Sequence, residues 1–418
     1  MTQQAGEPPR RRPLDGMRLL DLSHAAAGPV ATMGLADLGA EVIKIEMPGR
    51  GDGTRYFGRQ LHGYSYSDYF AGMNRNKKSL LVDMSRSEGV TLIRRLAARS
   101  DIVVQNFRPG VVERLGVGFD DLRAVRPHLV YGSISAYGAT GPWAKRPAND
   151  IIMQAVSGMM SITGEPDGGP VKVGAPVADY ASGLTLMSAV LAALIVRDEH
   201  PEGQHVQVAM LDAVVNLMGN FVPGLLAGKY ERIERQGSKH TQIVPYQAFE
   251  GSDGKYVMVG AFTEGFWHRL CAILGREDLA SDPRYETNAD RLANQETLLP
   301  VLEAAFRTRS RDEWLDILGS GDVPASAIYD LHEAILSDQA QHNGVVQWLV
   351  NPDDGEQRAG TVRSPIRSSA WPAERDGYPP PMGRHTREIL RSVLQMPDDE
   401  VDGLLAGGVV SDKPRSET

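Results

Sequence analysis

The chain has 418 residues, of which 42% are hydrophobic and 23% are charged, proportions that are typical of a globular protein and exclude fibrous and disordered classes. This length is sufficient for two or three domains and for a cleft between them. The net charge is -9, from 44 Lys and Arg against 53 Asp and Glu, so a protein that attracts nucleic acid or an anionic membrane through its overall field is not expected.

The first elements of the chain predict a compact βαβ unit. Residues 1–13 are polar and rich in Arg and Pro, and they are expected to form a disordered tail and not a signal peptide. Arg18–Leu22 then predicts a strand, and Pro29–Leu38 predicts a helix that ends at Gly39. Glu41–Glu46 predicts a second strand. Two strands joined by a helix in this way are parallel, so a parallel sheet is expected.

Strands and helices continue to alternate over much of the first half of the chain. Ser79–Met84 predicts a strand. Ser85, with Glu88 three residues later, predicts a capping box at the start of a helix that runs to about Arg99. Further strands are expected at Asp101–Gln105 and Leu129–Ser133, and further helices at Asp150–Met160 and Asp179–Arg197. The pattern is typical of a doubly wound α/β fold, so residues 14–220 are predicted to form a large Rossmann-like domain.

The character of the sequence changes in its second half. Residues 221–240, rich in Gly, Lys and Arg, predict a linker, and Tyr246–Gly260 predicts a β-hairpin. Helices are expected at Glu264–Leu274, Thr297–Phe306, Asp312–Leu318 and Thr386–Leu394. A smaller α+β domain is therefore predicted at residues 241–330. Residues 331–418 are predicted to form a return linker and a C-terminal part that packs on the large domain.

Cysteine usage and the length of the apolar segments limit the possible sites and the location. Cys271, the single cysteine, excludes an internal disulfide and Cys-rich metal sites, and no metal site is predicted. It lies in the apolar run Trp267–Leu274 and is expected to be a buried structural thiol. The apolar stretch Leu184–Val196 has 13 residues, which is too short for a membrane span. A cytoplasmic protein with no membrane partner is expected.

Three segments at the ends of predicted strands are candidates to meet a phosphate-containing ligand. His24–Pro29 lies between a strand and a helix, where small residues let backbone amides approach a phosphate; a plain tight turn accounts for the same residues. Asn74–Ser79 is basic and precedes a strand, and Asn106–Gly110 with Arg114 follows one. These charges are either solvated or, because α/β proteins bind ligands at strand ends, directed at a polyphosphate. Phe107 either stacks on a base or lies in the core.

Asp179 is the main catalytic candidate among the acidic residues. It begins a strongly apolar helix, so it is either the N-cap, which accepts backbone N–H bonds, or a carboxylate that the helix dipole holds ionised. An ionised, desolvated carboxylate can attack a thioester, since an acyl-aspartyl anhydride divides one difficult acyl exchange into easier steps. Asp150 follows Asn149 at the start of another helix, and it is in the same way either a cap or a second acid.

Six ordered motifs resemble those of the class III CoA-transferase family, and together they cover nearly the whole chain. They are Pro13–Gly16 with Leu20–Ser23, Gly39–Glu46, Asn76–Lys77, Asn106–Gly110, Asp150 with Gln154 and Ser157–Gly158, and Ala178–Gly183. The resemblance implies a Rossmann-like large domain, a small domain, and an interlocked homodimer in which two chains pass through each other as rings. It also implies acyl-CoA and a small carboxylic acid as substrates, CoA lying along the large domain, and no tightly bound cofactor.

The same resemblance implies roles for individual residues. Asp179 falls on the family's catalytic aspartate, and Asn149 and Asp150 fall where a second acid or an orienting group would lie. The positions that fall in CoA-contacting segments are His24, Ala25, Ala26, Ala27, Asn76, Lys77, Asn106, Phe107 and Arg114. The side chains expected to meet CoA phosphates are Lys77, Arg114 and Arg75. The candidates for orienting the acid are Tyr180, Gln154 and Arg146.

Two departures from related enzymes narrow the expected activity. The α-methylacyl-CoA racemases of the same family carry a His-Asp step where this chain has Asn149–Asp150. Asn cannot take a proton at neutral pH, so transfer is favoured over racemisation or epimerisation, which stays as the alternative. The formyl-CoA transferases carry a run of glycines that is missing from Gly251 to Gly265, so oxalate and formate are not the expected acids.

The acids themselves are predicted only as a class. Dicarboxylates such as succinate are expected on one side of the reaction, and the candidate contacts for their distal carboxylate are His240, Gln242 and Tyr246. A non-catalytic acyl-CoA-binding protein is the alternative from another functional class, and such a protein would not need Asp179. A nicotinamide dehydrogenase is not expected, because the glycine fingerprint of dinucleotide-binding domains is missing.

Overall fold

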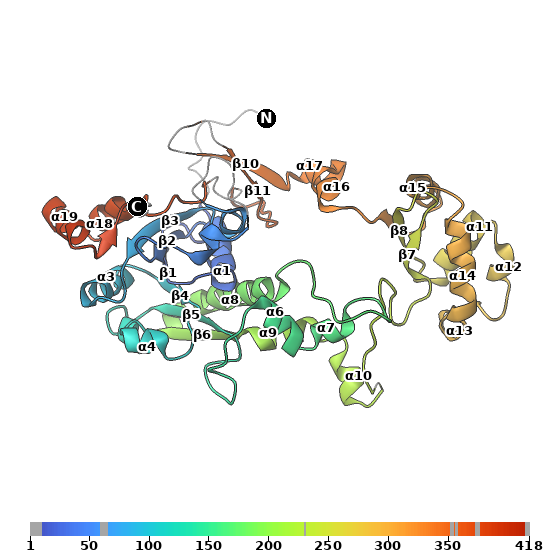
Figure 1. The fold of residues 1–418 in the computed structure, drawn as a ribbon, viewed down its shortest axis with the longest axis horizontal. Helices are drawn as coiled ribbons and strands as arrows, with labels where there is room; N and C mark the ends of the chain where they lie inside the picture. The colour runs from blue at the N-terminus through green and yellow to red at the C-terminus, as the bar shows by residue number, and fades with distance from the viewer. Residues whose placement is uncertain are drawn as a thin grey trace. The chain divides into compact units, whose positions relative to one another are not determined.

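A computed structural model describes residues 11–58, 66–229, 231–351, 355, 358–372 and 377–413 of the chain. These residues form two compact units, and Figure 1 labels most of their helices and strands. The large unit takes the described residues of Met1–Met159, Val173–Leu226 and Gln341–Thr418, and the small unit takes those of Met160–Lys172 and Ala227–Ala340. Most of the predicted disordered tail, residues 1–10, lies outside the described residues.

A seven-stranded sheet forms the centre of the large unit, in the order β12-β3-β2-β1-β4-β5-β6. Figure 1 labels six of these strands, β1 to β6. Its strands are β1 (Arg18–Asp21), β2 (Glu41–Glu46), β3 (Lys77–Val82), β4 (Ile102–Gln105), β5 (Val130–Ser135), β6 (Gln204–Ala209) and β12 (Val410–Ser411). Every neighbouring pair is parallel except β12 with β3, so the predicted α/β fold with a parallel sheet is confirmed. The strand order reverses between β1 and β4, and doubly wound sheets bind ligands at this switch point, beyond the carboxyl ends of the strands.

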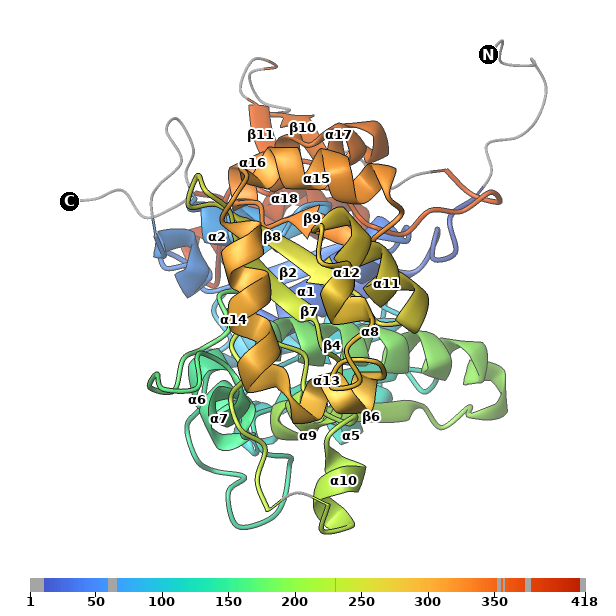
Figure 2. The same cartoon turned by 90° about the vertical axis from the view of Figure 1, so that its right-hand side faces the viewer.

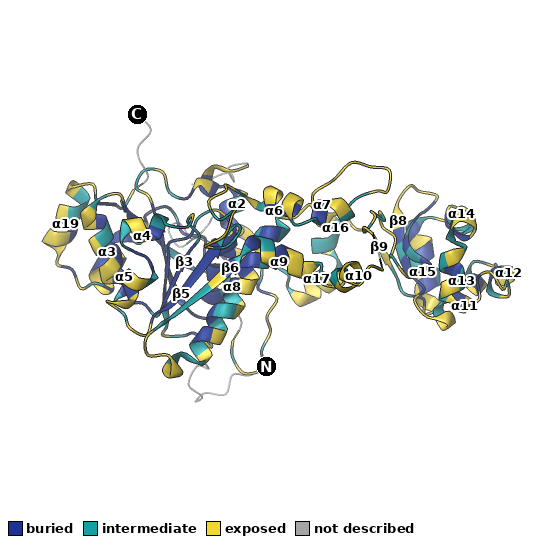
Figure 3. Cartoon of the chain, turned by 90° about the horizontal axis from the view of Figure 1, so that it is seen from below, coloured by how far each residue is buried: buried dark blue, intermediate teal, exposed yellow. Residues whose placement is uncertain are grey.

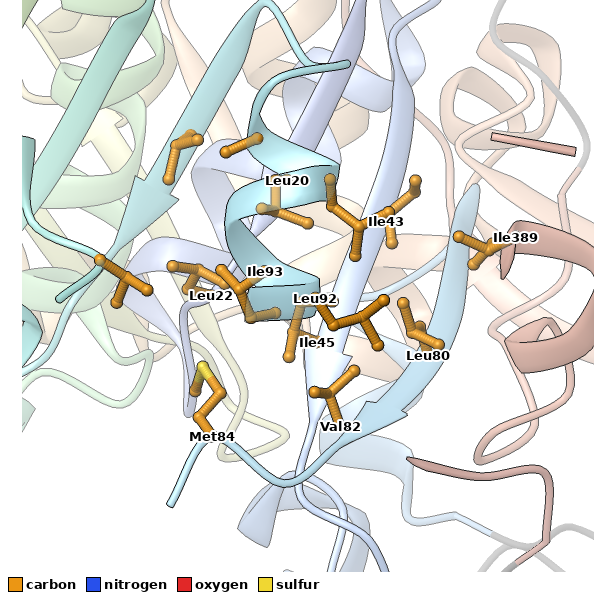
Figure 4. Close-up of a cluster of buried hydrophobic side chains, with 14 of the residues drawn as sticks. Leu20, Leu22, Ile43, Ile45, Leu80, Val82, Met84, Leu92, Ile93 and Ile389 are labelled. Atoms are coloured by element: carbon orange, nitrogen blue, oxygen red, sulfur yellow. The ribbon is translucent and has the colours of Figure 1, made fainter. Parts of the chain in front are cut away.

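Helices cover both faces of this sheet. One face is covered by α1 (Ala27–Asp37), α6 (Asp150–Val156), α8 (Val177–Ile195) and α9 (Met210–Leu217). The other is covered by α3 (Ser87–Ala97), α4 (Val111–Leu115), α5 (Phe119–Arg123), α18 (Thr386–Ser392) and α19 (Asp398–Ala406). Because successive strand residues point to opposite faces, Ile43 and Ile45 lie in the core with α3, and Val42 lies in the core with α1. Figure 4 shows part of the core between the sheet and α3. Figure 3 shows the buried strands between helices with exposed outer faces.

Short elements complete the large unit. They are the 3-10 helices η1 (Gly53–Tyr56) and η2 (Arg197–Glu199), the helices α2 (Asp68–Ala71) and α10 (Val222–Leu226), and the antiparallel hairpin of β10 (Val346–Val350) and β11 (Arg358–Val362). Two short helices span the division between the units, α7 (Met159–Ile162) and α17 (Asp338–Asn343).

The small unit combines a three-stranded antiparallel sheet with a set of helices (Figure 2). Its strands, in spatial order, are β7 (Tyr246–Glu250), β8 (Tyr256–Gly260) and β9 (Ala325–Ala327). Its helices are α11 (Glu264–Ile273), α12 (Glu277–Ala280), α13 (Asn288–Ala293), α14 (Gln295–Phe306), α15 (Arg311–Ser320) and α16 (Leu331–Leu336). Cys271 lies in its core, and burial raises the pKa of this thiol to about 12. The thiol is therefore buried and unreactive, as predicted.

The unit boundaries differ from the predicted domains. The small unit extends over residues 227–340 instead of 241–330, and it also includes residues 160–172, which the sequence analysis placed in the large domain. A backbone hydrogen bond explains the second difference, because Gly237 N donates to Gly164 O over 2.9 Å. The segment after α7 is thereby tied to the later part of the predicted linker, residues 227–240, and both belong to the small unit.

The predicted capping box at Ser85 does not form. α3 begins after Arg86, and no side chain accepts a hydrogen bond at its N-cap. Ser85 instead donates its hydroxyl to Asp83 Oδ1 over 2.6 Å, and the same oxygen accepts from Ser85 N. A local turn after β3 therefore competes successfully for this serine.

α8 is more apolar over its length than the sequence analysis expected. It has 19 residues and is long and apolar enough, by length and composition alone, to cross a membrane. The prediction that no apolar stretch reaches this length is therefore wrong, because the small residues of Ala178–Gly183 extend the apolar run toward the N-terminus. α8 packs against α1, α9, β5 and β6, which is the position of a core helix in a doubly wound fold.

Candidate active site

A cavity of about 380 Å³ opens at the switch point of the sheet. Its lining residues follow β1, β4, β5 and β6 or begin α1, α6 and α8; they are His24, Ala25, Ala26, Ala27, Asn106, Phe107, Arg108, Pro109, Ile134, Ser135, Ala136, Ala144, Arg146, Ala148, Asn149, Asp150, Asp179 and Met210. The cavity thus combines many small apolar side chains with a few charged ones. All of these residues belong to the large unit.

The turn between β1 and α1 forms one wall of the cavity. Ala25 has a left-handed φ of 61°, a conformation that is strained for a residue with a side chain. Asn106 holds the turn by two hydrogen bonds to His24, since its Oδ1 accepts from the backbone N over 2.8 Å and its Nδ2 donates to the backbone O over 2.7 Å. Ala26 is the N-cap of α1, where no side chain accepts a hydrogen bond. The turn is therefore held in a fixed shape, and the positive end of α1 stays available to an anion.

His24 and Phe107 face each other across this wall. Their rings meet edge to face, with centroids 5.2 Å apart, and Phe107 also packs against the core on the α3 side. Burial, followed by the charge of Lys44, lowers the pKa of the His24 imidazole. A neutral imidazole and a phenyl edge offer an apolar contact surface for a ligand.

The N-terminus of α8 carries Asp179, and Asp150 holds that terminus. Asp150 Oδ1 accepts from Ala178 N over 2.8 Å and from Asp179 N over 3.3 Å. The other oxygen, Oδ2, accepts from Gln154 Nε2 over 2.7 Å, and Gln154 Oε1 in turn accepts from Val173 N over 2.8 Å. Asp179 lies in the first turn and is not the N-cap of α8, which is Pro176. Asp150 therefore provides the capping function that the sequence analysis assigned to Asp179 as one possibility.

Asn149 has a structural function in α6. Its Oδ1 accepts from Ile152 N over 3.2 Å, which makes it the N-cap of that helix. Neither Asn149 nor Asp150 therefore has the geometry of a free second acid, because the cap engages the Asn149 oxygen and both Asp150 oxygens accept hydrogen bonds. The two residues orient the helices that border the cavity.

Burial controls the protonation of Asp179. Burial, followed by the negative charge of Asp150, raises the pKa of Asp179 from 3.8 to about 7. The expectation that the helix dipole holds this carboxylate ionised is therefore corrected, since loss of solvent and a neighbouring acid outweigh the dipole. A carboxylate with this pKa is a stronger base and nucleophile than a solvated one, and it is still about half ionised at neutral pH.

Gly183 sets the distance between α8 and α1. A Cβ atom at this position would lie 2.6 Å from Ala27 O and 2.9 Å from Val30, so glycine is required for the close approach of the two helices. This contact holds the first turn of α8, with Asp179, beside the β1–α1 turn.

Tyr69 lies on α2, and no pattern in the sequence marks it as a site residue. Its ring packs against Ala26 and Val30 of α1. Burial raises the pKa of its phenol, and the charges of Asp179 and Asp150 raise it further. Tyr69 therefore lies close enough to both carboxylates to respond to their charge, although no sequence motif surrounds it.

The predicted phosphate contact Lys77 is buried away from the cavity. Its ammonium donates to Asp21 Oδ2 over 3.1 Å, to Asn74 Oδ1 over 2.9 Å and to Pro29 O over 3.0 Å. An ammonium group has three donors, so none is left for a phosphate. The expected contact of Lys77 with CoA phosphates is therefore not supported by its side-chain position in this structure.

Three other predicted CoA contacts, Asn76, Arg75 and Arg114, also lie outside the cavity lining. Asn76 donates to Asp37 Oδ1 over 2.8 Å and accepts from Gly377 N over 2.7 Å, and Arg75 forms an ion pair with Asp37. Asn76 and Arg75 thus fasten α1 and the C-terminal segment to the sheet. Arg114 lies on α4 and is exposed to solvent.

Lys77 belongs to a buried group of ion pairs beneath the β1–α1 turn, which we call the ion cluster. Its members are Asp21, Lys44, Glu46, Asp52, Arg55 and Lys77, all at most 3% exposed. The shortest nitrogen–oxygen distances are 2.8 Å for Lys44 with Asp52 and 2.7 Å for Arg55 with Glu46. Lys44 also donates to Ser23 O over 2.9 Å. Through this hydrogen bond, the ion cluster stabilises the start of the β1–α1 turn.

The predicted contacts for a distal carboxylate belong to the small unit. His240 stacks on Tyr246 with ring centroids 5.2 Å apart, and its Nδ1 accepts from Gln242 N over 3.1 Å. The cavity residues, in contrast, all belong to the large unit. Among the residues that the structure describes, no group of three or more His, Cys, Asp and Glu side chains could hold a metal ion.

Together, the fold and the cavity define an α/β protein whose doubly wound sheet has a cavity at its switch point, lined by the carboxylate of Asp179. The chain matches the model of CoA-transferase family III over residues 14–386, and it belongs to that family. The protein is accordingly a CoA-transferase.

Related proteins agree with this assignment. A succinyl-CoA:glutarate CoA-transferase from Mus musculus is 38% identical over 400 residues, covering 96% of this chain and 90% of the relative. A succinate–glutarate CoA-transferase from Agrobacterium fabrum is 36% identical, covering 92% of this chain and 96% of the relative. The crystal structure of a CAIB/BAIF family protein from Brucella suis superimposes with a TM-score of 0.82 at 34% identity, covering 92% of this chain and 100% of that one.

Proposed function

We propose that this CoA-transferase moves CoA between an acyl-CoA donor and a free dicarboxylic acid of the size of succinate or glutarate, and that Asp179 carries the acyl group. The observation that carries the proposal is the Asp179 carboxylate, which lines the cavity at the switch point with a pKa raised to about 7. The names of the mouse and Agrobacterium relatives support the choice of acids.

The reaction proceeds in four steps that exchange acyl groups on one carboxylate. Ionised Asp179 attacks the donor thioester carbonyl, forming a C–O bond and breaking the C–S bond, which gives a mixed anhydride and a CoA thiolate. The thiolate attacks the aspartyl carbonyl and releases the donor acid, leaving an aspartyl-CoA thioester. The acceptor carboxylate attacks this thioester and frees the thiolate again. The thiolate then attacks the acceptor's carbonyl in the second anhydride, which regenerates Asp179.

The environment of Asp179 suits each of these steps. Burial makes the carboxylate a better nucleophile and protects the anhydrides from water. Asp150 fixes the first turn of α8 through the amides of Ala178 and Asp179, so the nucleophile is held in place. Gln154 holds Asp150 in turn. Asp150 and Gln154 are thus positioning residues.

CoA is proposed to enter beside the β1–α1 turn. His24, Ala25, Ala26 and Ala27 line the cavity together with Asn106 and Phe107. Asn106 acts by holding the His24 backbone, and Asn76 and Lys77 act by stabilising the structure around the turn. Arg114 is exposed on α4, and we assign it to the phosphate groups at the outer end of CoA. No tightly bound cofactor is required.

We further propose an interlocked homodimer in the cytoplasm, with no nucleic-acid or membrane partner. Large apolar side chains on the surface of the large unit support the dimer, among them Leu184, Ile195 and Leu226, which are 54%, 84% and 84% exposed. Such side chains are expected to be covered by a second chain. The small unit of a partner is proposed to close the cavity, and His240, Gln242 and Tyr246 stay candidates for contacting the acid from there.

Racemisation is not favoured by this site. It requires a second acid–base group opposite Asp179. Asn149 serves as the N-cap of α6, and both oxygens of Asp150 accept hydrogen bonds. A non-catalytic binding protein is not favoured either, because it would gain nothing from a buried carboxylate of raised pKa.

The experiment is a mass-spectrometric assay of the purified protein with succinyl-CoA and a panel of free acids. Formation of new acyl-CoA species is expected with glutarate, and borohydride or hydroxylamine added during turnover should modify the peptide that contains Asp179. Incubation of a 2-methylacyl-CoA in heavy water is the control. Rapid α-deuteration without acyl exchange and without an Asp179 adduct would contradict the proposal and favour racemisation.

A further inference from the structure

Two arginines at the cavity have no acidic partner. Arg108 and Arg146 both line it, and within the described part of the chain neither side chain forms an ion pair or a hydrogen bond. The Arg146 guanidinium carbon lies 4.7 Å from the centroid of the Trp143 ring, which restricts its orientation. A guanidinium group that is held in place without a carboxylate partner is suited to bind an anion.

These two arginines are the cationic groups of the cavity wall. The lining otherwise consists of small apolar and neutral polar side chains, the neutral His24, and the acids Asp150 and Asp179. A dicarboxylic acid brings a second carboxylate that does not react. This group would be repelled by both acids and would lose its hydration in the cavity, so it requires a counter-charge.

Arg146 is better placed than Arg108 to supply that charge. It precedes Asp150 by four residues, so their Cα atoms are separated by at most about 14 Å, and Asp150 Oδ1 lies 3.3 Å from Asp179 N. Arg108 follows Asn106, which holds the β1–α1 turn. The two arginines therefore reach the cavity from the ends of different strands. Arg146 follows β5 and lies near Asp150, which orients the proposed nucleophile. Arg108 follows β4 and lies near the turn that is proposed to receive CoA.

We propose that the Arg146 guanidinium binds the non-reacting carboxylate of the dicarboxylic acid and so selects diacids over monoacids. This inference rests on the proposed function, because it assumes that the acceptor reacts at Asp179. Trp143 holds the guanidinium plane while two N–H groups donate to the two oxygens of the carboxylate. Arg146 is thus a specificity-determining residue, and it takes no part in the covalent steps.

The test compares two acceptor acids of equal chain length, succinate and butyrate, with the same acyl-CoA donor at saturation. In Arg146→Met we expect kcat/KM for succinate to fall about 10- to 100-fold, the loss of a charge-assisted contact, and kcat/KM for butyrate to change less than about 3-fold. Arg146→Lys keeps a charge without the bidentate geometry, so it should lie between Arg146→Met and the wild type. Thermal unfolding of each variant checks that the fold is retained.

Arg108→Met is the matched control, because Arg108 reaches the cavity from a different strand end. It should raise the KM for acyl-CoA and leave the ratio of succinate to butyrate unchanged. An unchanged ratio in Arg146→Met, or an equal loss for both acids, overturns the inference. If the ratio of succinate to butyrate changes in Arg108→Met and not in Arg146→Met, the inference is also overturned, and Arg108 is then the residue that binds the second carboxylate. If the wild-type enzyme transfers CoA to butyrate and to no diacid, the proposed choice of acids fails, independently of the Arg146 variants.

Discussion

Two groups of charged residues adjoin the same edge of the sheet, and they differ in whether their charges are paired. In the ion cluster, Lys77 donates to Asp21, Lys44 pairs with Asp52, and Arg55 pairs with Glu46. At the cavity, the arginines lack acidic partners within the described chain, and Asp150 contributes to raising the pKa of Asp179. The comparison teaches that the same residue types stabilise the fold where their charges are paired and can serve chemistry where they are not.

The difference between paired and unpaired charges is reflected in whether the pKa of each acid is lowered or raised. Burial acts to raise the pKa of Asp21, but Lys77 and Lys44 hold it below its ordinary value. Glu46 behaves in the same way, because Arg55 outweighs the effect of burial on its pKa. No cation among the described residues lowers the pKa of Asp179, so burial and Asp150 raise it to about 7.

The largest effect is expected from removing the unpaired carboxylate. Asp179→Asn should lower the rate of acyl exchange by at least about 10⁴-fold, because the covalent carrier is lost. The mass-spectrometric exchange assay measures this loss. A variant that retains a tenth of wild-type turnover would contradict the role of Asp179.

The same variant should gain stability, in contrast to variants of the ion cluster. Folding raises the pKa of Asp179 from 3.8 to about 7, so the folded state binds the proton more tightly and is destabilised as pH rises through this interval. Above pH 7 the penalty is complete, and Asp179→Asn should then be more stable than wild type by about 1–3 kcal/mol, allowing for partial solvent access. Urea unfolding at pH 8 and at pH 4 checks this, since most of the gain should vanish at pH 4.

Breaking a pair in the ion cluster should have the opposite effect on stability. Lys77→Met leaves Asp21 buried without its partner, which should destabilise the protein by about 3–5 kcal/mol. Arg114→Met is the matched control, because an exposed basic residue should change stability by no more than about 0.5 kcal/mol. Urea unfolding at pH 7.5 measures both. If Lys77→Met unfolds like wild type and only loses affinity for CoA, then Lys77 contacts CoA after all.

A smaller effect is expected where the two groups meet, at the β1–α1 turn. Asn106→Ala removes both side-chain hydrogen bonds to His24, so stability should fall by about 1–2 kcal/mol and affinity for CoA by about 10-fold. Asn106→Asp keeps the acceptor for His24 N and should lose less. Calorimetric titration with CoA gives the affinity. If Asn106→Ala binds CoA with unchanged affinity, the turn keeps its shape without the two hydrogen bonds from Asn106.

The smallest effect concerns the charge of Asp150. Asp150→Asn keeps an oxygen for the amides of α8 but removes the negative charge that helps raise the pKa of Asp179, so that pKa should fall. Because the reaction needs ionised Asp179, the acidic limb of kcat/KM should move to lower pH. Asn149→Ala, which removes only the α6 cap at about 1 kcal/mol, should leave the limb in place. A limb that does not move in Asp150→Asn would contradict the electrostatic role of Asp150.

Local patterns in the sequence were sufficient to predict β1 to β5 and to select Asp179, the proposed nucleophile. β2 has the predicted bounds, Glu41–Glu46, since its alternation of residues is strong and Gly39 ends the preceding helix. Asp179 was found through its motif and its position at the start of an apolar helix. The strand Ser79–Met84 was predicted two residues late, because Lys77 and Lys78 read as surface charges although they begin β3.

The features that could not be predicted are contacts between residues that lie far apart in the sequence. Lys77 and Arg108 both lie beside strand ends and look alike in sequence. They differ because β1, β2 and β3 lie side by side, which brings Asp21 to Lys77, while Arg108 follows β4 and meets no acid within the described residues. Asp150 likewise binds the terminus of a helix that begins 27 residues later, at Val177. Such pairings depend on tertiary register, which a single sequence does not encode locally.

The position of β12 has a consequence for how the chain is synthesised. Val410 and Ser411 pair with Val82 and Leu81 of β3 and complete the edge of the sheet. About 330 residues separate the two strands, and at roughly 5–20 residues per second the ribosome needs about 15–65 s to supply the second one. During this interval β3 is an open edge strand, and open edges pair with other chains. We expect nascent chains that stop before Val410 to be the most aggregation-prone forms of this protein and the ones that depend most on chaperones.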